Sequence, residues 1–477
     1  MLESISTTLN NVVGDINNIL WTYVLIALLL LIGLYFTVRT KFVQFRYIKE
    51  MIRLLGEGAT ASRKQKKGIT SFQAFAISTA ARVGTGNLAG VASAIALGGP
   101  GAVFWMWVVA LVGSASAFVE STLAQIYKVK DKDGFRGGPA YYMEKGLNKR
   151  WMGVLFSILI TISFGLVFNS VQSNTISLAF EEAFGLNRLV IGIVITAIFS
   201  ILIFRGIKII AKASEVIVVI MAVIYIGLAI IVLALHITEV PAMFALIFKS
   251  AFGFEEAFAG AIGAAIMNGI KRGLFSNEAG MGSAPNAAAA ASVTHPAKQG
   301  LIQALGVFTD TLIICSCTAF IVLLSGAYTT PGLEGIQLTQ TALSTHIGGW
   351  AVQFIAVILF LFAFSSLVGN YYYGETNIEF LTSNKVWLTV YRLGVIAMVL
   401  FGSVASLGVV WGLADLFMGI MAIVNLIAIF LLGKIAIAAL NDYMAQRKEG
   451  KDPVFHKDRI QGLENVEYWD APSKADN

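Results

Sequence analysis

The chain has 477 residues, of which 57% are hydrophobic and only 13% are charged. A soluble globular domain carries about a quarter charged residues, so this composition excludes an ordinary soluble core. The apolar runs are long and do not alternate with polar residues, which favours membrane-spanning helices over a β-barrel. The net charge of +6 then indicates basic loops that meet anionic lipid, and no nucleic-acid partner.

Apolar runs of about 20 residues predict helices that cross the bilayer. We expect about eleven of them, near residues 18–38, 71–94, 99–127, 151–180, 187–204, 212–236, 255–284, 299–326, 347–371, 387–409 and 413–440. The first run is not a signal peptide, because Glu3 and Asp15 precede it and no basic residue does.

Lysine and arginine concentrate in alternate loops, which predicts an N-terminus outside and a C-terminus in the cytoplasm of the inner (plasma) membrane. The chain then divides into an external N-terminus, an extra N-terminal helix, a basic cytoplasmic loop, a first five-helix repeat, an external linker, a second repeat and a polar cytoplasmic tail. These segments cover residues 1–17, 18–38, 39–70, 71–236, 237–254, 255–440 and 441–477. We expect the tail to be loosely ordered.

The second span is interrupted in its middle by polar and flexible residues. Arg82 and Asn87 stand among glycines at Gly84, Gly86 and Gly90. Glycine weakens a helix and lets backbones approach closely. Unwound backbone is tolerated inside a membrane only where protein or a cavity receives its polar groups. We therefore expect a broken helix that lines a site.

The seventh span carries a similar interruption between Asn268 and Gly282. The two interruptions are five spans apart, so ten helices form two five-helix halves that each begin with a broken helix. Five spans per half make the second half enter from the opposite side, which inverts the repeat. This is the leucine-transporter-like layout of secondary transporters, with one extra N-terminal helix in front.

Broken helices offer two kinds of ligand. Half-helix N-termini present free amides to a carboxylate, and freed carbonyls bind a hard cation. Residues 84–87 would supply such amides, while Ala80 and Val83 would supply carbonyls to a sodium ion beside Ser365 and Ser366 of the ninth span. The alternative is that these serines bond their own helix backbone, as serines in membrane helices do.

Two long strings resemble the alanine/glycine:cation symporter family. They are GGPGAVFWMW at residues 98–107 and GLFSNEAGMGSAP at residues 273–285. The resemblance covers nearly the whole chain. It implies the leucine-transporter-like fold, coupling to sodium or protons, and import of alanine or glycine, with glutamine taken by some members.

The resemblance also implies roles for single residues. The first break would hold the substrate backbone, Gln172 would face its amine, and the seventh span would line its side-chain pocket. The implied substrate-binding set is Thr85, Gly86, Asn87, Gln172, Asn174, Met267, Asn268, Ile270 and Asn370. The implied sodium set is Ala80, Val83, Ser365 and Ser366, with no other cofactor. Because Gln172 and Asn174 are two positions apart, we expect one of them to bond a neighbouring helix instead.

Ionisable residues at membrane depth are costly, so each suggests a reason. Arg82 is either a gate on the ion path or a structural partner of Glu120 or Asp310. The resemblance also implies that Arg82 falls where the wider fold places a second sodium, which disfavours that second site. Asp310 is also a candidate proton or ion partner. The possible gate or coupling residues are Arg82, Asp310, Lys271, Arg272 and Glu278, of which the last three form either an inner gate or a permanent network.

The residues and the resemblance together predict a symporter that imports a small neutral amino acid with sodium by alternating access. The alternatives are a proton-coupled symporter that uses Asp310 or Glu120, and a receptor of the same fold that binds an amino acid without moving it. A channel is disfavoured because the polar residues cluster at the midplane. An enzyme is not expected, because no nucleophile–base pair or transition-metal ligand spacing occurs. Cys315 and Cys317 point to different sides of one helix, which argues against a disulfide.

Overall fold

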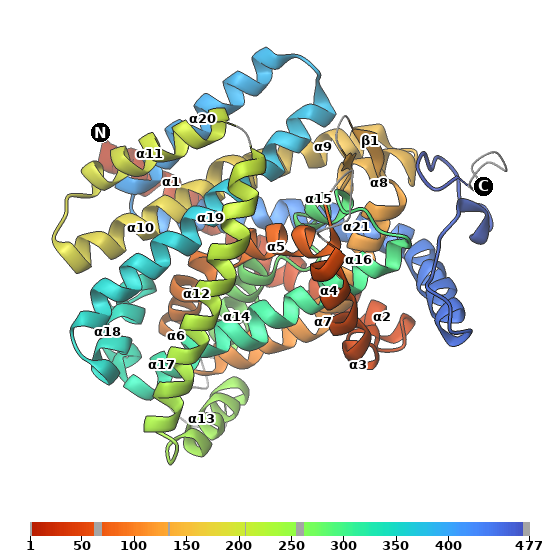
Figure 1. Ribbon diagram of the computed structural model, residues 1–477. Helices are drawn as coiled ribbons and strands as arrows, with labels where there is room; N and C mark the ends of the chain where they lie inside the picture. Colours follow the sequence, from red (N-terminus) through yellow and green to blue (C-terminus); the bar gives the residue numbers. More distant parts are fainter. Residues whose placement is uncertain (1, 62–68, 132–133, 206, 254–261, 471–477) are drawn as a thin grey trace.

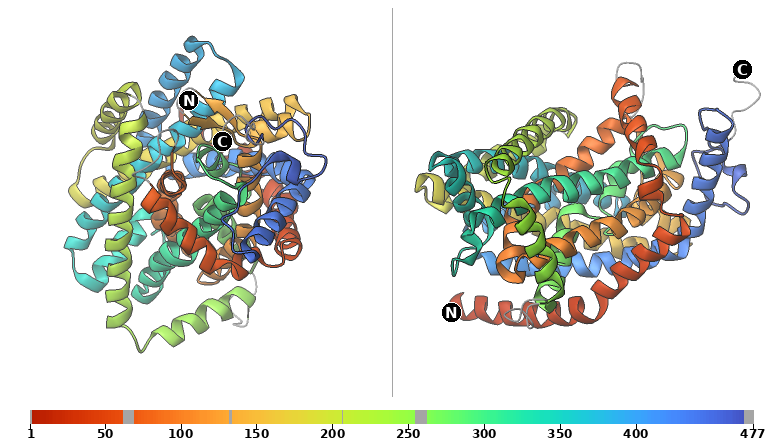
Figure 2. Two further views of the ribbon diagram at one scale, coloured as in Figure 1. Left: turned by 45° about the vertical axis from the view of Figure 1, so that its right-hand side comes forward. Right: turned by 90° about the horizontal axis from the view of Figure 1, so that it is seen from below.

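The structure is a computed structural model that describes residues 2–61, 69–131, 134–205, 207–253 and 262–470. Helices make up most of this described chain, and β1 (Val129–Asp131) and β2 (Gly134–Arg136) form one small antiparallel sheet. The start of α1 and the described end of the chain near residue 470 lie at opposite ends of the helix bundle (Figures 1 and 2). This position of the termini agrees with an odd number of spans.

The helices up to the first long loop are α1 (Leu2–Ile19), η1 (Leu20–Leu25), α2 (Ile26–Arg39), α3 (Val43–Arg46), α4 (Ile48–Ala61), α5 (Ser71–Arg82), η2 (Gly86–Gly90), α6 (Val91–Gly98) and α7 (Gly101–Ile126). The next are α8 (Pro139–Lys145), α9 (Arg150–Ile160), η3 (Thr161–Phe168), α10 (Asn169–Phe184), α11 (Arg188–Arg205), α12 (Ile207–Leu235) and α13 (Val240–Phe252). The last are α14 (Ile262–Asn277), α15 (Ala284–Ala289), α16 (Pro296–Val307), η5 (Phe308–Cys315), α17 (Ser316–Ser325), η6 (Ala327–Thr329), α18 (Gly335–Ile347), α19 (Trp350–Leu381), α20 (Lys385–Val404), α21 (Leu407–Lys448) and η7 (Lys457–Arg459).

Within the described residues, seven helices are long and apolar enough to cross a membrane, or eight if a pair bent by 104° between α12 and α13 counts as one span. Two shorter apolar helices, Gly86–Gly98 and Arg188–Phe204, add to them. Length and apolar composition therefore support a multi-pass membrane protein, while the count of eleven stays a prediction. The start of the predicted seventh span, residues 255–261, lies outside the described residues.

The first predicted break is present between α5 and η2. A capping box starts α5, in which Thr70 Oγ1 accepts from the Gln73 N–H and Gln73 Oε1 accepts from the Thr70 N–H. The helix ends at Arg82, and Val83 leaves it in an extended conformation with φ −78° and ψ 96°. The polar and glycine-rich string therefore does interrupt the span.

The second break is shorter than the sequence predicts. Helix α14 runs on through Lys271 and Gly273 to Asn277, and the chain leaves helical geometry only from Glu278 to Ser283. Gly269 and Gly273 do not unwind α14, because they lie against the backbone of Ala102 and the side chain of Val109 on α7. Small residues there serve close helix packing.

Each break opens a series of five helical segments. After α5–α6 come α7, α9–α10, α11 and α12, and after α14–α15 come α16–α17, α19, α20 and α21. The fold is therefore an all-helical, leucine-transporter-like arrangement of two repeats, with α1–α2 as the extra N-terminal helix along one edge of the bundle (Figure 2).

The helices form two packing groups. Helices α6, α14 and α16 all pack on α7, and we call these four helices the α7 group. Helices α10, α11, α19 and α20 likewise pack on one another, and we call them the α10 group. The first break lies where these groups meet, since α5 packs on α19 while η2 packs on α14. The second break leads into α15, which packs on α7 and also touches α19.

The described part of the tail, residues 441–470, is not loosely ordered as the sequence suggested; residues 471–477 lie outside the described residues. Helix α21 continues to Lys448, and residues 451–470, which we call the strap, fold back onto the body of the protein. Within the strap, Phe455 and Trp469 are only 2% and 5% exposed. Burial of these two large apolar side chains in a mostly polar tail explains why the strap docks.

Candidate functional site

The first break frees a carbonyl at the end of α5. In a continuous helix the Gly84 N–H would donate to the Ala80 oxygen. It donates instead to Asn87 Oδ1 over 2.9 Å. The Ala80 oxygen is therefore available to groups outside its own helix.

Two hydroxyls of α19 reach that carbonyl. Ser366 Oγ lies 3.0 Å from the Ala80 oxygen and 3.4 Å from the Val83 oxygen. Ser365 Oγ lies 3.4 Å from the Ala80 oxygen. Both hydroxyls also lie within hydrogen-bonding distance of the Phe362 oxygen on their own helix, as the alternative predicted. The structure thus brings all four predicted sodium ligands together, and a cluster made only of oxygens fits a hard cation.

Gln172 of α10 also reaches the first break. Its Oε1 accepts from the Thr85 N–H over 3.3 Å. Asn174 points elsewhere and donates to the carbonyls of Gly402 and Ala405, both over 2.8 Å. The two side chains therefore divide as their spacing predicted, because Gln172 contacts the break and Asn174 joins α10 to α20.

Asn87 connects the first break to the second repeat. Its Nδ2 donates to Asp310 Oδ1 over 2.7 Å and to Ser276 Oγ over 3.0 Å. Ser276 Oγ donates in turn to Asp310 Oδ2 over 2.7 Å, and Thr311 Oγ1 donates to the same oxygen over 2.9 Å. The predicted coupling residue Asp310 is thus a direct partner of the predicted substrate residue Asn87.

Three aromatic rings cover the first break on one side. The centroids of Phe168 and Phe275 are 4.5 Å apart, and those of Phe275 and Trp411 are 4.8 Å apart. Gly86 lies directly under this layer, because a Cβ atom there would come within 2.9 Å of the Phe275 ring. The layer gives the first break an apolar wall.

Lys271 and Arg272 pair with α21 instead of with Glu278. Arg272 Nη2 lies 2.7 Å and Lys271 Nζ lies 3.7 Å from Asp415 Oδ2. The Arg272 guanidinium also stacks 4.3 Å from the centroid of the Trp411 ring. Lys271 and Arg272 therefore join neither a gate nor a network with Glu278 among the described contacts, because they pair with Asp415 of α21 while Glu278 follows the end of α14.

Carboxylates occupy the second break itself. Glu120 of α7 accepts from the backbone N–H groups of Gly280 (3.2 Å) and Gly282 (3.1 Å), and from Asn425 Nδ2 (2.8 Å). Glu278 has a positive φ of 58° and accepts from the Ser283 hydroxyl. The freed amides of this break are thus used by protein side chains.

Arg82 and Asn370 are buried without partners. They are 3% and 1% exposed, and within the described part of the chain neither the three guanidinium nitrogens nor the two amide atoms have a hydrogen-bond partner. The expected structural pair of Arg82 with Glu120 or Asp310 is therefore not formed. Thr85 Oγ1 is likewise buried and unpaired among the described residues, so three polar groups around the first break keep unused hydrogen-bonding capacity.

The expected pocket residues Met267, Asn268 and Ile270 lie within α14, before the second break begins. Asn268 Nδ2 donates to the Ala264 oxygen of its own helix over 2.9 Å. Met267 is half-buried and Ile270 is fully buried. The residues of α14 that contact the first break are instead Phe275 and Ser276, one to two turns further along. Phe275 and Ser276 lie within residues 273–285, one of the two strings that resemble the family, but nothing in the sequence marked these two side chains as part of the site.

Asp415 was also missed. It was visible as one acidic residue inside the last apolar run. Its partner could not be assigned, because the contact joins residues 143 positions apart.

Comparison with known proteins agrees with this architecture. The sequence model of the sodium:alanine symporter family matches residues 6–457. The chain is 63% identical to the probable sodium/glutamine symporter GlnT of Bacillus subtilis (97% of this chain, 96% of that protein) and 57% identical to its amino-acid carrier protein AlsT (98% and 99%). It is 38% identical to the sodium/alanine symporter AgcS of Methanococcus maripaludis (92% and 98%).

Among solved structures, a sodium-coupled sialic acid symporter in a substrate-bound outward-open state is similar with a TM-score of 0.49 and 14% identity, covering 92% of this chain and 93% of that one. The family match over nearly the whole chain and the extensive identity to its members settle the class. The chain is a multi-pass membrane transporter and no enzyme, and it belongs to the sodium:alanine symporter family of cation-coupled amino-acid symporters.

Proposed function

We propose that this protein imports a small neutral amino acid together with sodium by alternating access. The observation that carries the proposal is the convergence of the Ala80 and Val83 carbonyls with the Ser365 and Ser366 hydroxyls at the first break. A sodium ion bound there would tie α5 to α19. It would thereby hold the adjacent residues 84–87 in place for the substrate.

The substrate that fits is a zwitterion with a small side chain. Its carboxylate would meet the amides after Gly84, and its amine would meet Gln172 Oε1, which lies at the same break. The aromatic layer of Phe168, Phe275 and Trp411 would cover its side chain. Two similar proteins are named for alanine and glutamine, so alanine, glycine and glutamine are the substrates to test first.

We also propose the orientation that the basic loops predict, with the N-terminus outside and the C-terminus in the cytoplasm of the plasma membrane. Arg272 and Asp415 would then lie on the external side of the first break, since α14 and α21 would both enter from outside. Their ion pair would close the external path.

A second candidate is proton coupling through Asp310. Its carboxylate accepts from Asn87, Ser276 and Thr311, and within the described residues it forms no ion pair. A proton bound there would change the orientation of Asn87, which also accepts from the Gly84 N–H. This route would link protonation directly to the first break.

Uptake by purified protein in liposomes tests both candidates. Radiolabelled alanine, glycine and glutamine are supplied with an inward sodium gradient or with choline in place of sodium. Uptake that collapses in choline supports sodium coupling. Uptake that is indifferent to sodium and follows an imposed pH gradient supports proton coupling, and binding without uptake supports the receptor alternative.

A further inference from the structure

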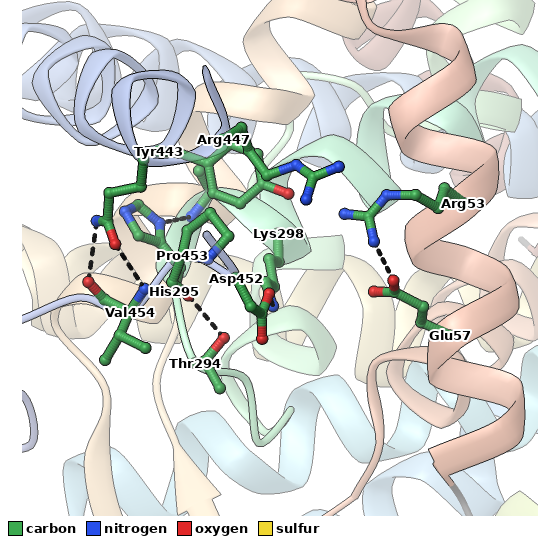
Figure 3. Close-up of polar contacts among 12 residues, drawn as sticks. Arg53, Glu57, Thr294, His295, Lys298, Tyr443, Arg447, Asp452, Pro453 and Val454 are labelled. Carbon is green, nitrogen blue, oxygen red and sulfur yellow. Dashed lines mark hydrogen bonds and ion pairs between the residues drawn. The ribbon is translucent and has the colours of Figure 1, made fainter. Parts of the chain in front are cut away.

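The strap is anchored first to the segment before α16. The Phe455 N–H donates to the Thr294 oxygen over 2.9 Å, and Thr294 Oγ1 donates to the Pro453 oxygen over 2.9 Å. Lys298 Nζ lies 2.6 Å from Asp452 Oδ1. Figure 3 shows Thr294, Lys298, Asp452 and Pro453 between α21 and α4. This end of the strap is therefore attached to the α7 group.

A second anchor of the strap lies at the end of α7. Trp469 Nε1 donates to the Gln125 oxygen over 2.9 Å. Trp469 and Tyr468 also enclose Lys128 together with Phe135, with ring centroids 4.8, 4.6 and 4.0 Å from Lys128 Nζ. The ammonium group is fully buried and donates to Gln125 Oε1 and the Ala291 oxygen. The ring contacts around Lys128 and the Trp469 hydrogen bond form a second attachment of the strap to the α7 group.

A third anchor reaches the other packing group. Asn465 Nδ2 donates to the Lys145 oxygen over 3.1 Å and to Asn148 Oδ1 over 2.9 Å. Lys145 Nζ also pairs with Glu467. Lys145 is the last residue of α8, which packs mainly on α9 and to a lesser extent on α7. Helix α9 runs on through η3 into α10. The strap therefore spans from the α7 group to the α10 group.

Alternating access in two-repeat transporters proceeds largely by rocking of one helix group against the other. A segment bonded to both groups on one face resists their separation on that face, because its contacts are lost when they part. We propose that residues 451–470 form a latch that holds the C-terminal face of the transporter closed. The inference rests on the proposed alternating-access function.

Amide exchange at the second break can report on the latch, because the strap contacts described above do not involve that break. The amides of Gly280 and Gly282 are bonded to Glu120, and none of the strap contacts above involves residues 278–283. If the strap only covers a surface, its release exposes residues 290–298 and 125–148 alone. If it is a latch, release also loosens residues 278–283.

Hydrogen–deuterium exchange on the full-length protein in nanodiscs separates these cases. One variant, Trp469→Ala, releases the α7 anchor. A second variant combines Glu467→Gln with Asn465→Ala, releases only the α8 anchor, and changes side chains exposed enough to leave the fold intact. The control is Lys451→Ala, whose ammonium group pairs with Glu449 at the surface.

We expect exchange at residues 278–283 to rise about tenfold in both test variants and to stay unchanged in the control and at α18, as a local opening requires. Sodium-driven uptake of alanine should become faster in the same variants. If amide exchange of the strap becomes fast while exchange at residues 278–283 stays as slow as in the wild type, the latch is overturned. So would a uniform rise that includes α18. A protein that shows no uptake in any form would refute the proposed function, while the exchange data would still test the latch.

Discussion

Asp415 Oδ2 lies 2.7 Å from Arg272 Nη2, and the two side chains are only 8% and 6% exposed. Lys271 approaches the same carboxylate, so one acid balances two cations next to the aromatic layer over the first break. Removing one partner of a buried pair leaves an uncompensated charge, which costs about 3–5 kcal/mol. This contact is therefore both a structural bond and the candidate external closure.

The first prediction concerns that pair. Asp415→Asn keeps the shape of the side chain but leaves Arg272 and Lys271 without a counter-charge, so we expect a clear fall in thermal stability and loss of uptake. Thermal unfolding of the purified protein measures the first effect. Glu375→Gln is the matched control, because its pair with Arg392 is more exposed, with side chains 15% and 23% accessible, and should cost about 1 kcal/mol or less. Equal losses in the two variants would contradict a special role for Asp415.

The second prediction concerns the oxygen cluster. Ser366→Ala removes the hydroxyl nearest to the Ala80 carbonyl, so the sodium concentration for half-maximal uptake should rise about tenfold, the effect of losing one ligand worth about 1–2 kcal/mol. The alanine concentration dependence should change less when sodium is saturating. Ser403→Ala is the control, because that hydroxyl donates to the Val399 oxygen of its own helix. An unchanged sodium dependence in Ser366→Ala would remove this cluster as the sodium site.

The third prediction concerns the close approach at Gly84. A Cβ atom there would clash with Ser366 Oγ and come within 3.0 Å of Gln172 Oε1. Gly84→Ala should therefore push α19 and α10 away from the first break and abolish uptake. Gly227→Ala in α12 is the control, because no atom lies within 4 Å of its added Cβ and alanine favours a helix. Normal uptake by Gly84→Ala would show that this close approach is not needed for transport.

The fourth prediction separates sodium from proton coupling. Asp310→Asn keeps the size of the side chain but cannot titrate, and it can still bond Ser276 and Thr311. Under sodium coupling at the Ala80 cluster, we expect reduced uptake that still depends on sodium. Under proton coupling, uptake driven by a pH gradient should vanish, while exchange of bound substrate should persist. The same uptake assay with each gradient applied alone distinguishes the two outcomes.

The fifth prediction concerns pH and His295 at the start of α16. Its Nδ1 accepts from the Ala297 N–H and its Nε2 lies 3.1 Å from Asp442 Oδ2, so the ring is neutral with its hydrogen on Nε2. Burial lowers the pKa of His295 even though Asp442 acts in the opposite direction. The charged groups facing the ring are Asp442, Lys298 and Arg459.

A histidine whose pKa is lower in the folded protein takes up its proton mainly on unfolding. The stability that His295 contributes is therefore complete above about pH 6.5, the value for unfolded histidine, and declines as the pH falls below it. Thermal unfolding between neutral and mildly acidic pH should show this decline. His295→Asn retains a side-chain cap and should flatten it, and an unchanged slope would assign the effect to other groups.

Much of the site was accessible from local sequence. Arg82 and Gly84 inside an apolar run predicted the first break, because a membrane leaves few ways to satisfy such residues. Ser365 and Ser366 stood out for the same reason, and the expected unwinding after Ala80 predicted their partner carbonyls. The position of the break in the seventh span was harder to predict. Gly269 and Gly273 look the same in sequence whether they unwind a helix or allow α7 to pack against it.

The sequence by itself determined that this chain crosses a membrane, that two of its spans are interrupted five spans apart, and that it resembles a cation symporter. Those features depend on composition and spacing along the chain. Only the tertiary structure decided that Asp415 balances Arg272, that Glu120 fills the second break, and that the tail docks as a strap. These contacts join residues more than 100 positions apart. Their energies depend on which faces of distant helices meet, and local sequence periodicity carries no information about that.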